Sequence, residues 1–322
     1  MSGPRLALLC PGQGAQKVGM GRALATAFPA AQRVFDEAGA ILGVDFLRVV
    51  WEGPEEELRQ TLNTQPALLA HSVAAIRVLE ERGVRAAFAA GHSLGEYSAH
   101  VAAGSLAFAD ALRLVRRRGE LMQAAGQARP GAMAALVGLG PAAAEVLCRA
   151  ARAAGAGEVV AANLNSPAQV VVSGEVGAVE TVMAQAKPAG ARMVVRLEVS
   201  GAFHSPLMAP AAAGLAAALA AVPVRDAAFP VVANATAQPV REAAAIRAAL
   251  GAQLLAPVRW EQSMRRLLAE GAGAFVEVGS GKVLRGLLKA VDKEAPSANV
   301  DDPASLEEAL GLLAGLGVEV SA

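Results

Sequence analysis

The stretch AGHSLGEYSAHVAAG, residues 90–104, follows the short apolar run VRAAFAA at 84–90 and continues into an alanine-rich segment. Its centre is a Gly-x-Ser-x-Gly pentad around Ser93. A strand, a sharp turn flanked by small residues and a helix together form a nucleophile elbow, in which the serine hydroxyl is exposed above a sheet. The pattern predicts such a unit within a parallel α/β sheet, with Ser93 as nucleophile. A glycine-rich turn with an incidental serine is the alternative.

Length and charge limit the classes of protein that fit. The chain has 322 residues, which suits a main domain with a smaller insert. Because 29 Lys and Arg balance 29 Asp and Glu, we expect neither a nucleic-acid partner nor a membrane partner. The only cysteines, Cys10 and Cys148, have no metal-site spacing, so we expect no metal and a cytoplasmic location. The apolar run at 6–10 is too short for a signal peptide, and no run is long enough to span a membrane.

The order of the apolar runs predicts two units of an α/β fold. From 129 to 199 the order is strand, helix, strand, strand, helix, strand, which is typical of a ferredoxin-like unit. We therefore expect residues 1–128 and 200–322 to form a large, hydrolase-like α/β domain with a parallel sheet. Residues 129–199 would form the inserted small subdomain. Outside the insert, the same reasoning predicts strands at 6–10, 84–90, 229–235 and 274–278, and helices at 65–82, 107–123 and 261–271 and from Pro206 and Arg241.

A serine nucleophile needs a base, and the histidines narrow the choice. The chain has four: His71, His92, His100 and His204. His71 and His100 lie in predicted helices, and His92 neighbours the serine but should point away from it. The last lies in VSGAFHSPLM, directly before a serine and a proline that suit a helix N-cap and first turn. A lone loop histidine is usually a surface group, but beside an elbow serine His204 is the favoured base.

The third member of a catalytic triad is missing from the sequence. The only aspartate between Ser93 and His204 is Asp110, at the start of a predicted helix. We therefore expect a Ser–His dyad whose imidazole is oriented by neutral acceptors such as a backbone carbonyl. This expectation argues against an ordinary esterase.

Three consecutive arginines occur in LRLVRRRGELMQ, residues 112–123. At about 100° per residue, Arg118 falls on the apolar face with Leu112 and Val115, whereas Arg117 is nearly opposite. A buried guanidinium needs an anion. That anion is either a structural Asp or Glu or the carboxylate of a substrate, and beside an acyl-transfer nucleophile we favour the substrate.

Eight segments together resemble one family, the bacterial malonyl-CoA:acyl carrier protein transacylases, and more widely the acyltransferase domains of fatty acid and polyketide synthases. They occur in that family's order and at similar spacing over nearly the whole chain. The segments are PGQGAQ, QPALLA, GHSLGEYSA, RRRGELMQ, NSPAQVVVSG, VSGAFHSPLM, APVRW and EVGSGKVLRGL. Cys10, Ala107 and Ser280 depart from the family pattern without touching the chemistry.

The resemblance implies a role for each matching position. Ser93 would be acylated, His204 would be the base, and Arg118 would bind the malonyl carboxylate. The backbone N–H groups of Gln13 and Leu94 would form the oxyanion hole. Three further residues would belong to the substrate-binding site. Phe203 would select malonyl, Gln253 would support the histidine, and Asn165 would lie near the acyl pocket.

The resemblance also implies the reaction. The malonyl group of malonyl-CoA would pass through a malonyl-serine intermediate to the phosphopantetheine thiol of acyl carrier protein, supplying fatty acid biosynthesis. A free-standing malonyl acyltransferase serving a polyketide synthase is the alternative. A hydrolase is disfavoured by the absence of a triad acid and by Arg118. A catalytically silent binding subunit is disfavoured because Ser93, His204 and Arg118 are all present. We expect no permanently bound cofactor and a monomer.

Overall fold

The computed structural model describes residues 3–318, and its larger sheet has six strands in the order β10-β9-β1-β2-β7-β8. All neighbouring strands are parallel except β7 and β8. The strands are β1 (Arg5–Cys10), β2 (Phe88–Gly91), β7 (Val231–Val232), β8 (Pro239–Val240), β9 (Ala272–Val278) and β10 (Ser297–Val300). A predominantly parallel sheet of this kind confirms the α/β class predicted from the sequence.

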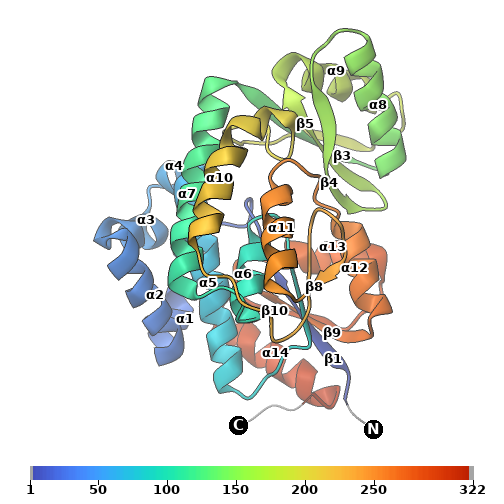
Figure 1. The fold of residues 1–322 in the computed structure, drawn as a ribbon. Coiled ribbons are helices and arrows are strands. Elements are labelled where there is room, and N and C mark those ends of the chain that lie inside the picture. The colour runs from blue at the N-terminus through green and yellow to red at the C-terminus, as the bar shows by residue number, and fades with distance from the viewer. Residues whose placement is uncertain (1–2, 319–322) are drawn as a thin grey trace.

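Helices separate most of these strands along the chain and follow the last of them (Figure 1). Those of the first half are α1 (Arg22–Ala27), α2 (Pro29–Leu42), α3 (Val44–Glu52), α4 (Glu55–Arg59), α5 (Thr61–Glu81), α6 (Gly95–Ala102), α7 (Phe108–Ala128) and α8 (Pro141–Ala153). Those of the second half are α9 (Val176–Ala186), the 3₁₀ turn η1 (Pro206–Met208), α10 (Ala209–Ala221), α11 (Ala243–Gln253), α12 (Trp260–Ala269), α13 (Val283–Val291) and α14 (Pro303–Gly315).

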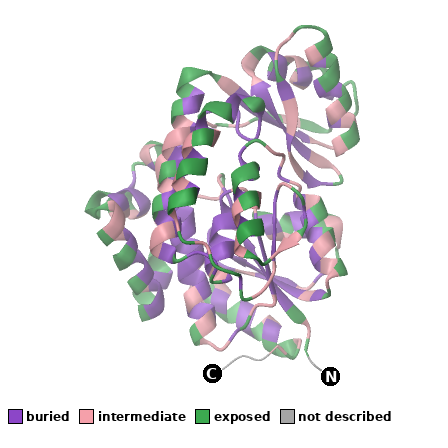
Figure 2. Cartoon of the chain, viewed as in Figure 1, coloured by how far each residue is buried: buried purple, intermediate pink, exposed green. Residues whose placement is uncertain are grey.

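Both faces of the large sheet are covered, and the central strand β1 shows why. Side chains alternate between the faces of a strand, so Leu6 and Leu8 join one core while Ala7 and Leu9 join another. The first core contains residues of α2, α5, α6 and α7, and the second contains residues of α12 and α13. In Figure 2 the strands of this sheet are buried along most of their length. The continuous apolar sequence of β1 follows from this two-sided burial.

A second, four-stranded antiparallel sheet lies at one end of the molecule, at the top of Figure 1. Its strands are β3 (Gly131–Val137), β4 (Val159–Ser166), β5 (Gln169–Glu175) and β6 (Met193–Arg196), in the order β4-β5-β3-β6. Helices α8 and α9 pack on one face of it. From the other face, Met133, Ala135 and Val171 join the core of the larger unit. The division into domains at 129 and 199 stays a prediction.

Several element bounds differ from those that the sequence predicts. The strand expected at 84–90 is confined to Phe88–Gly91, and that expected at 229–235 to Val231–Val232, because the chain turns at once from Ala233 to Ala237. The helix expected at 107–123 continues to Ala128, and the one expected at 65–82 begins at Thr61.

Element bounds after residue 200 also differ from those predicted. The segment from Pro206 begins with a 3₁₀ turn before α10, and the helix expected from Arg241 begins at Ala243. No sequence pattern predicted β8, α13, β10 or α14.

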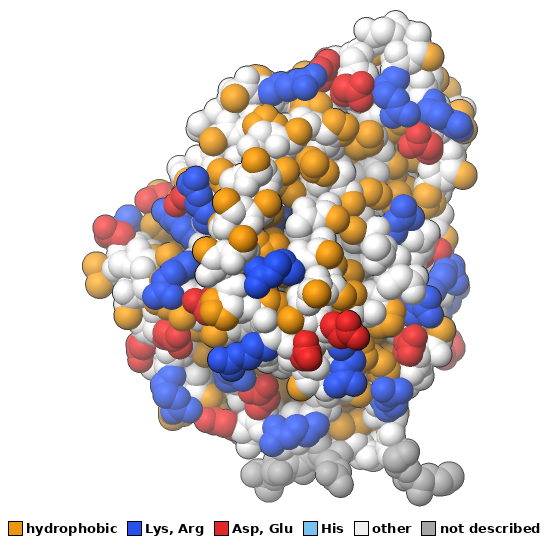
Figure 3. All heavy atoms as spheres, in the orientation of Figure 1, with side chains coloured by type: hydrophobic (Ala, Val, Ile, Leu, Met, Phe, Trp, Pro, Cys, Tyr) orange, Lys and Arg blue, Asp and Glu red, His pale blue; other side chains and the backbone are white. Residues whose placement is uncertain are grey.

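The surface carries charges of both signs. Figure 3 shows basic and acidic side chains interspersed over the face that carries α10 and α11, with apolar atoms between them. In the described part of the chain, no helix has the length and apolar character needed to cross a membrane.

Candidate active site

The pentad around Ser93 forms a sharp turn between β2 and α6. Ser93 adopts a left-handed conformation with φ 50°, which is rare for a residue with a side chain. A Cβ at Gly91 would lie 1.9 Å from the carbonyl group of Gly95, and a Cβ at Gly95 would lie 2.0 Å from the carbonyl oxygen of Cys10. Both positions therefore require glycine, because backbone atoms occupy the space of a side chain.

Asn234, two residues after the end of β7, holds this turn in place. Its Oδ1 accepts a hydrogen bond from the Ser93 N–H at 2.7 Å, and its Nδ2 donates to the Gly91 carbonyl at 2.6 Å. The side chain is almost fully buried. These two bonds offset the cost of the strained Ser93 backbone. No local sequence pattern points to Asn234.

His204 faces the serine from the loop before η1. Its Nε2 lies 2.7 Å from Ser93 Oγ, and its Nδ1 lies 3.1 Å from the Gln253 carbonyl oxygen and 3.2 Å from that of Ala256. Carbonyl oxygens only accept, so Nδ1 carries the hydrogen and the lone pair of Nε2 faces the hydroxyl. Burial, reinforced by the positive charge of Arg118, lowers the pKa of His204 to about 3. At neutral pH the imidazole is therefore an unprotonated acceptor.

Ser205 fixes the approach of that histidine. Its Oγ donates to the Ala202 carbonyl at 2.6 Å and accepts from the Leu207 N–H at 3.2 Å, which caps the 3₁₀ turn. His204 itself has φ 56°, so both partners of the 2.7 Å contact have left-handed backbones. Strain of this kind concentrates at functional sites.

Two backbone N–H groups lie free beside the serine. Within residues 3–318, neither the Leu94 N–H nor the Gln13 N–H has a hydrogen-bond partner, and both residues line the same cavity as Ser93. Leu94 is at the N-terminus of α6, where the helix dipole also favours negative charge. The loop of Gln13 is held by Ser280, whose Oγ donates to the Ala15 carbonyl at 2.6 Å. This arrangement suits an oxyanion hole.

Arg118 is buried beneath the serine, as the helix periodicity predicts. It is 1% exposed, whereas Arg117 is half-exposed and pairs with Glu120. The Arg118 Nη2 donates to Ser93 Oγ at 3.1 Å and to Gln253 Oε1 at 3.0 Å. No ion pair found in residues 3–318 includes Arg118, and its Nε has no partner there. The guanidinium can therefore accept an external anion.

Gln253 links the parts of the site, although its side chain lies behind the cavity wall. Its Nε2 donates to the Ser93 carbonyl at 2.8 Å and to Glu96 Oε2 at 2.7 Å. The same carboxylate oxygen accepts from the Asn234 N–H at 3.1 Å. Glu96 is fully buried, and burial raises its pKa to about 7. Glu96 was not among the site residues predicted from the sequence.

A cavity of about 640 Å³ opens onto the serine between the small sheet and the larger unit. Phe203 lies in its wall and is almost fully buried. Asn165 also lines it, but its Oδ1 contacts His92 Nε2 at 2.9 Å rather than the serine or His204. Of the predicted site residues, those that line the cavity are Gln13, Ser93, Leu94, Arg118, Asn165, Phe203 and His204.

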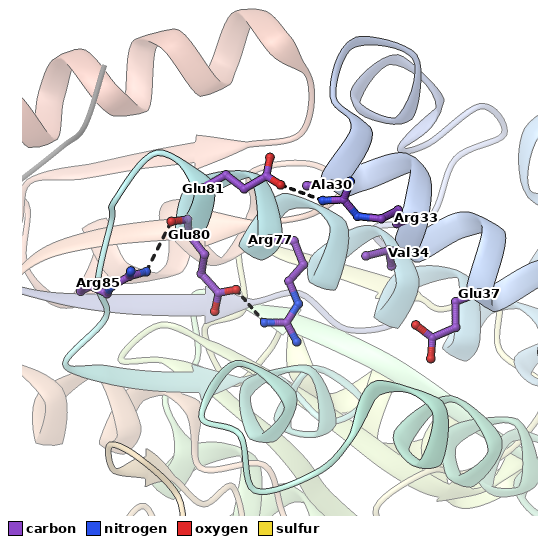
Figure 4. Close-up of a pocket in the computed structure, with 8 residues that line it drawn as sticks. All are labelled: Ala30, Arg33, Val34, Glu37, Arg77, Glu80, Glu81 and Arg85. Atoms are coloured by element: carbon purple, nitrogen blue, oxygen red, sulfur yellow. Dashed lines mark hydrogen bonds and ion pairs between the residues drawn. The ribbon is translucent and has the colours of Figure 1, made fainter.

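A second hollow, of about 510 Å³, lies between α2 and α5 (Figure 4). Four of its charged side chains form ion pairs, because Arg33 pairs with Glu81 and Arg77 with Glu80. None of its lining residues is a serine, cysteine or histidine. The part of the chain that the structure describes also contains no group of three or more His, Cys, Asp or Glu that could hold a metal ion. The cavity at Ser93 is thus the candidate active site.

Comparison with known proteins agrees with this geometry. The model of the acyl transferase domain family matches residues 7–309. The malonyl CoA-acyl carrier protein transacylase of Bacillus subtilis (strain 168) is 46% identical, over 96% of this chain and 97% of that protein. The solved structure of the Coxiella burnetii transacylase of that name has a TM-score of 0.92 at 38% identity, covering 97% and 99% of the two chains.

A further solved structure shows a malonyl-transacylase in complex with a type II PKS acyl-carrier protein. It is 44% identical to this chain, with a TM-score of 0.91, and covers 95% of this chain and 99% of its own.

Proposed function

The chain belongs to the acyl transferase domain family, and from this we propose that it transfers the malonyl group of malonyl-CoA to an acyl carrier protein. It is an acyltransferase of the malonyl-CoA:acyl carrier protein S-malonyltransferase type. The acceptor is the phosphopantetheine thiol of the carrier. Supply of fatty acid biosynthesis is the role that we assign.

Acylation begins at the short contact between Ser93 and His204. Nε2 of His204 takes the hydroxyl proton while Oγ attacks the thioester carbonyl. The resulting oxyanion lies against the N–H groups of Leu94 and Gln13. When the intermediate collapses, the C–S bond breaks and the CoA sulfur receives the proton from the imidazolium. The product is a malonyl ester on Ser93 and free CoA.

Transfer to the carrier reverses these steps. The phosphopantetheine thiol gives its proton to His204 and attacks the ester, and Ser93 Oγ recovers a proton as the C–O bond breaks. The two carbonyls that accept from Nδ1 keep the ring in one tautomer throughout. A Ser–His dyad is therefore sufficient in this proposal, and no cofactor takes part.

The observation that carries the malonyl assignment is the buried guanidinium of Arg118. The groups that it contacts directly in the described chain are neutral, so no carboxylate occupies its hydrogen-bonding fork. A malonyl group on Ser93 ends in a carboxylate, and the hydroxyl of Ser93 lies 3.1 Å from this guanidinium. A fork-shaped, permanently charged group is suited to that carboxylate.

The direct test is mass spectrometry after incubation with malonyl-CoA. We expect a malonyl adduct on the peptide that contains Ser93 and its loss on addition of phosphopantetheinylated acyl carrier protein. Ser93→Ala should abolish both, and His204→Ala should slow acylation by roughly 10²- to 10⁴-fold. Transfer by the Ser93→Ala variant at a substantial rate would refute the covalent scheme.

The polyketide alternative has one observation in its favour. The relative that is solved with a type II PKS carrier protein is as similar to this chain as the others. Rates with carrier proteins purified from the two pathways would separate the two roles. A cytoplasmic location and a monomeric state remain predictions from the sequence.

A further inference from the structure

Glu96 lies outside the proposed chemistry, yet it is a fully buried carboxylate close to the nucleophile. It occupies the first turn of α6, three residues after Ser93. Its Oε2 accepts from Gln253 and from the backbone of Asn234, whereas its Oε1 has no partner among the described residues. A buried carboxylate with a free oxygen carries a cost in stability unless a nearby opposite charge compensates it.

The compensating charge is Arg118, although the two do not form an ion pair. Gln253 stands between them, since its Oε1 accepts from Arg118 at 3.0 Å and its Nε2 donates to Glu96 at 2.7 Å. Among residues 3–318, Arg118 is the only charged side chain that lowers the pKa of the Glu96 carboxyl against the effect of burial. The amide therefore connects one buried cation to one buried anion.

The other titratable groups around Glu96 are neutral near pH 7. Helix α6 packs against β1, β2, β7, α5 and α7, and the buried titratable groups that these elements and α6 itself contribute, besides Glu96 and Arg118, are Cys10, His71, Tyr97 and His100. Burial raises the pKa of the Cys10 thiol and raises that of Tyr97 to about 12. It lowers the pKa of both histidines, that of His100 to about 3.

The remaining ionisable side chains of α5 and α7, such as Arg77 and Arg117, lie toward solvent. Beyond those helices, His204 and His92 also have pKa values that burial lowers. Near neutral pH, Glu96 is thus the only group of this buried set whose charge can change.

We propose that Glu96 is the counter-charge of Arg118 before acylation, and that Glu96 takes up a proton when the malonyl carboxylate binds that guanidinium. This inference rests on the proposed function. Two carboxylates near one buried cation repel each other, so the second disfavours ionisation of the first. The incoming carboxylate is held by the fork of Arg118, and Glu96, which is linked only through an amide, becomes neutral. Glu96 is a positioning residue in this scheme, because it acts through Arg118 and Gln253.

Malonyl and acetyl transfer should differ in their dependence on pH. An acetyl group brings no carboxylate, so its transfer does not require Glu96 to be neutral. Malonyl transfer proceeds best from the enzyme with neutral Glu96, and that population shrinks as pH rises through the pKa of about 7. The ratio of kcat/KM for malonyl-CoA to that for acetyl-CoA should therefore fall about 5- to 30-fold between pH 6 and pH 8.5. Titration of His204 or of CoA affects both substrates and cancels in the ratio.

Substitution tests the assignment to Glu96. In Glu96→Gln the ratio should become independent of pH, within about twofold, because the amide cannot titrate. Glu277→Gln is the matched control, since Glu277 is also a buried carboxylate with a pKa raised to about 7, but its carboxylate accepts from the backbone N–H groups of Leu284 and Arg285 rather than from Gln253. That variant should keep the slope of the wild type. A flat ratio in the wild type, or the same slope in Glu96→Gln, would overturn the proposal.

Proton uptake by the wild-type enzyme gives a test that needs no variant. Exchange of a thioester for a serine ester releases no proton while the CoA thiol stays protonated. With an indicator dye in weak buffer at pH 7.5, malonyl-CoA should cause uptake of up to one proton per acyl-enzyme, and acetyl-CoA none. Equal uptake with both substrates, or none with either, contradicts the mechanism. Failure to form any malonyl adduct would instead refute the proposed function itself.

Discussion

Replacing Arg118 by alanine tests the physical basis of substrate choice. The guanidinium is 1% exposed, so solvent and salt screen it little. In the variant a malonyl carboxylate would be desolvated without a partner, which costs roughly 2 to 5 kcal/mol for a buried charge pair. Malonyl transfer should therefore fall by about 30-fold to several thousand-fold in kcat/KM.

Transfer from acetyl-CoA serves as the internal control, because it reports damage to the site without the loss of a carboxylate partner. The variant also loses the hydrogen bonds of Arg118 to Ser93 Oγ and Gln253 Oε1, and this loss applies to either substrate. We expect it to change acetyl transfer by less than about tenfold. Arg118→Lys keeps the charge but not the fork, so it should restore malonyl transfer only in part.

Arg117→Ala is the matched control, because it removes a neighbouring arginine from the same helix whose side chain is half-exposed and pairs with Glu120. It should leave both rates within about twofold. The measurement is kcat/KM for malonyl-CoA and acetyl-CoA in all four proteins. If Arg118→Ala lowers both substrates by the same factor, Arg118 is a structural residue and the carboxylate argument is refuted.

Three further predictions concern the pocket, the turn and the pH dependence of stability. Phe203→Ser should raise methylmalonyl transfer relative to malonyl transfer, because it removes a ring from the cavity wall; an unchanged ratio excludes shape selection by Phe203. Gly91→Ala should abolish soluble, folded protein, since its Cβ would lie 1.9 Å from the Gly95 backbone, whereas Gly251→Ala, with open space around it, should fold normally by circular dichroism. Burial lowers the pKa of all four histidines, so their contribution to the free energy of unfolding is complete above their unfolded pKa of 6.5 and lost as pH falls below it; urea titrations should show this loss, and constant stability down to pH 4.5 would contradict it.

The groups that the sequence identifies are those whose chemistry leaves a local pattern. The elbow requires small residues on both sides of Ser93, and the pentad displays them. Arg118 was placed on a buried face by helix periodicity alone, and it is buried. His204 was predicted as the base because the chain has only three other histidines and none of them suited the role. Its Nε2 lies 2.7 Å from Ser93 Oγ.

Bounds of weak elements could not be predicted, because tertiary contacts decide them. Only two residues of the expected strand at 229–235 pair with β2, after which Asn234 turns its side chain to the elbow. Helix α5 contains Pro66, which removes a helical hydrogen bond, yet the helix starts before it because most of its residues are buried. Propensity alone would start the helix near this proline, as the sequence prediction of 65–82 does.

Asn234 and Glu96 were not predicted, because each contacts partners that lie far away along the chain. Asn234 is 141 residues from Ser93 along the chain, and Glu96 is 157 from Gln253. Gln253 was carried over only as a support for the histidine, but its contacts extend further. Its backbone carbonyl accepts from His204, and its side chain contacts Arg118, Glu96 and the Ser93 carbonyl.

These contacts of Gln253 have a consequence for how the site works. An amide that donates to Ser93 and Glu96 while accepting from Arg118 has one orientation that satisfies all three, because its oxygen and nitrogen cannot be exchanged. The backbone of the same residue fixes the tautomer of His204. The group that would bind the carboxylate and the group that would move the proton are therefore held by one residue, and a shift of α11 that loosens one must loosen the other.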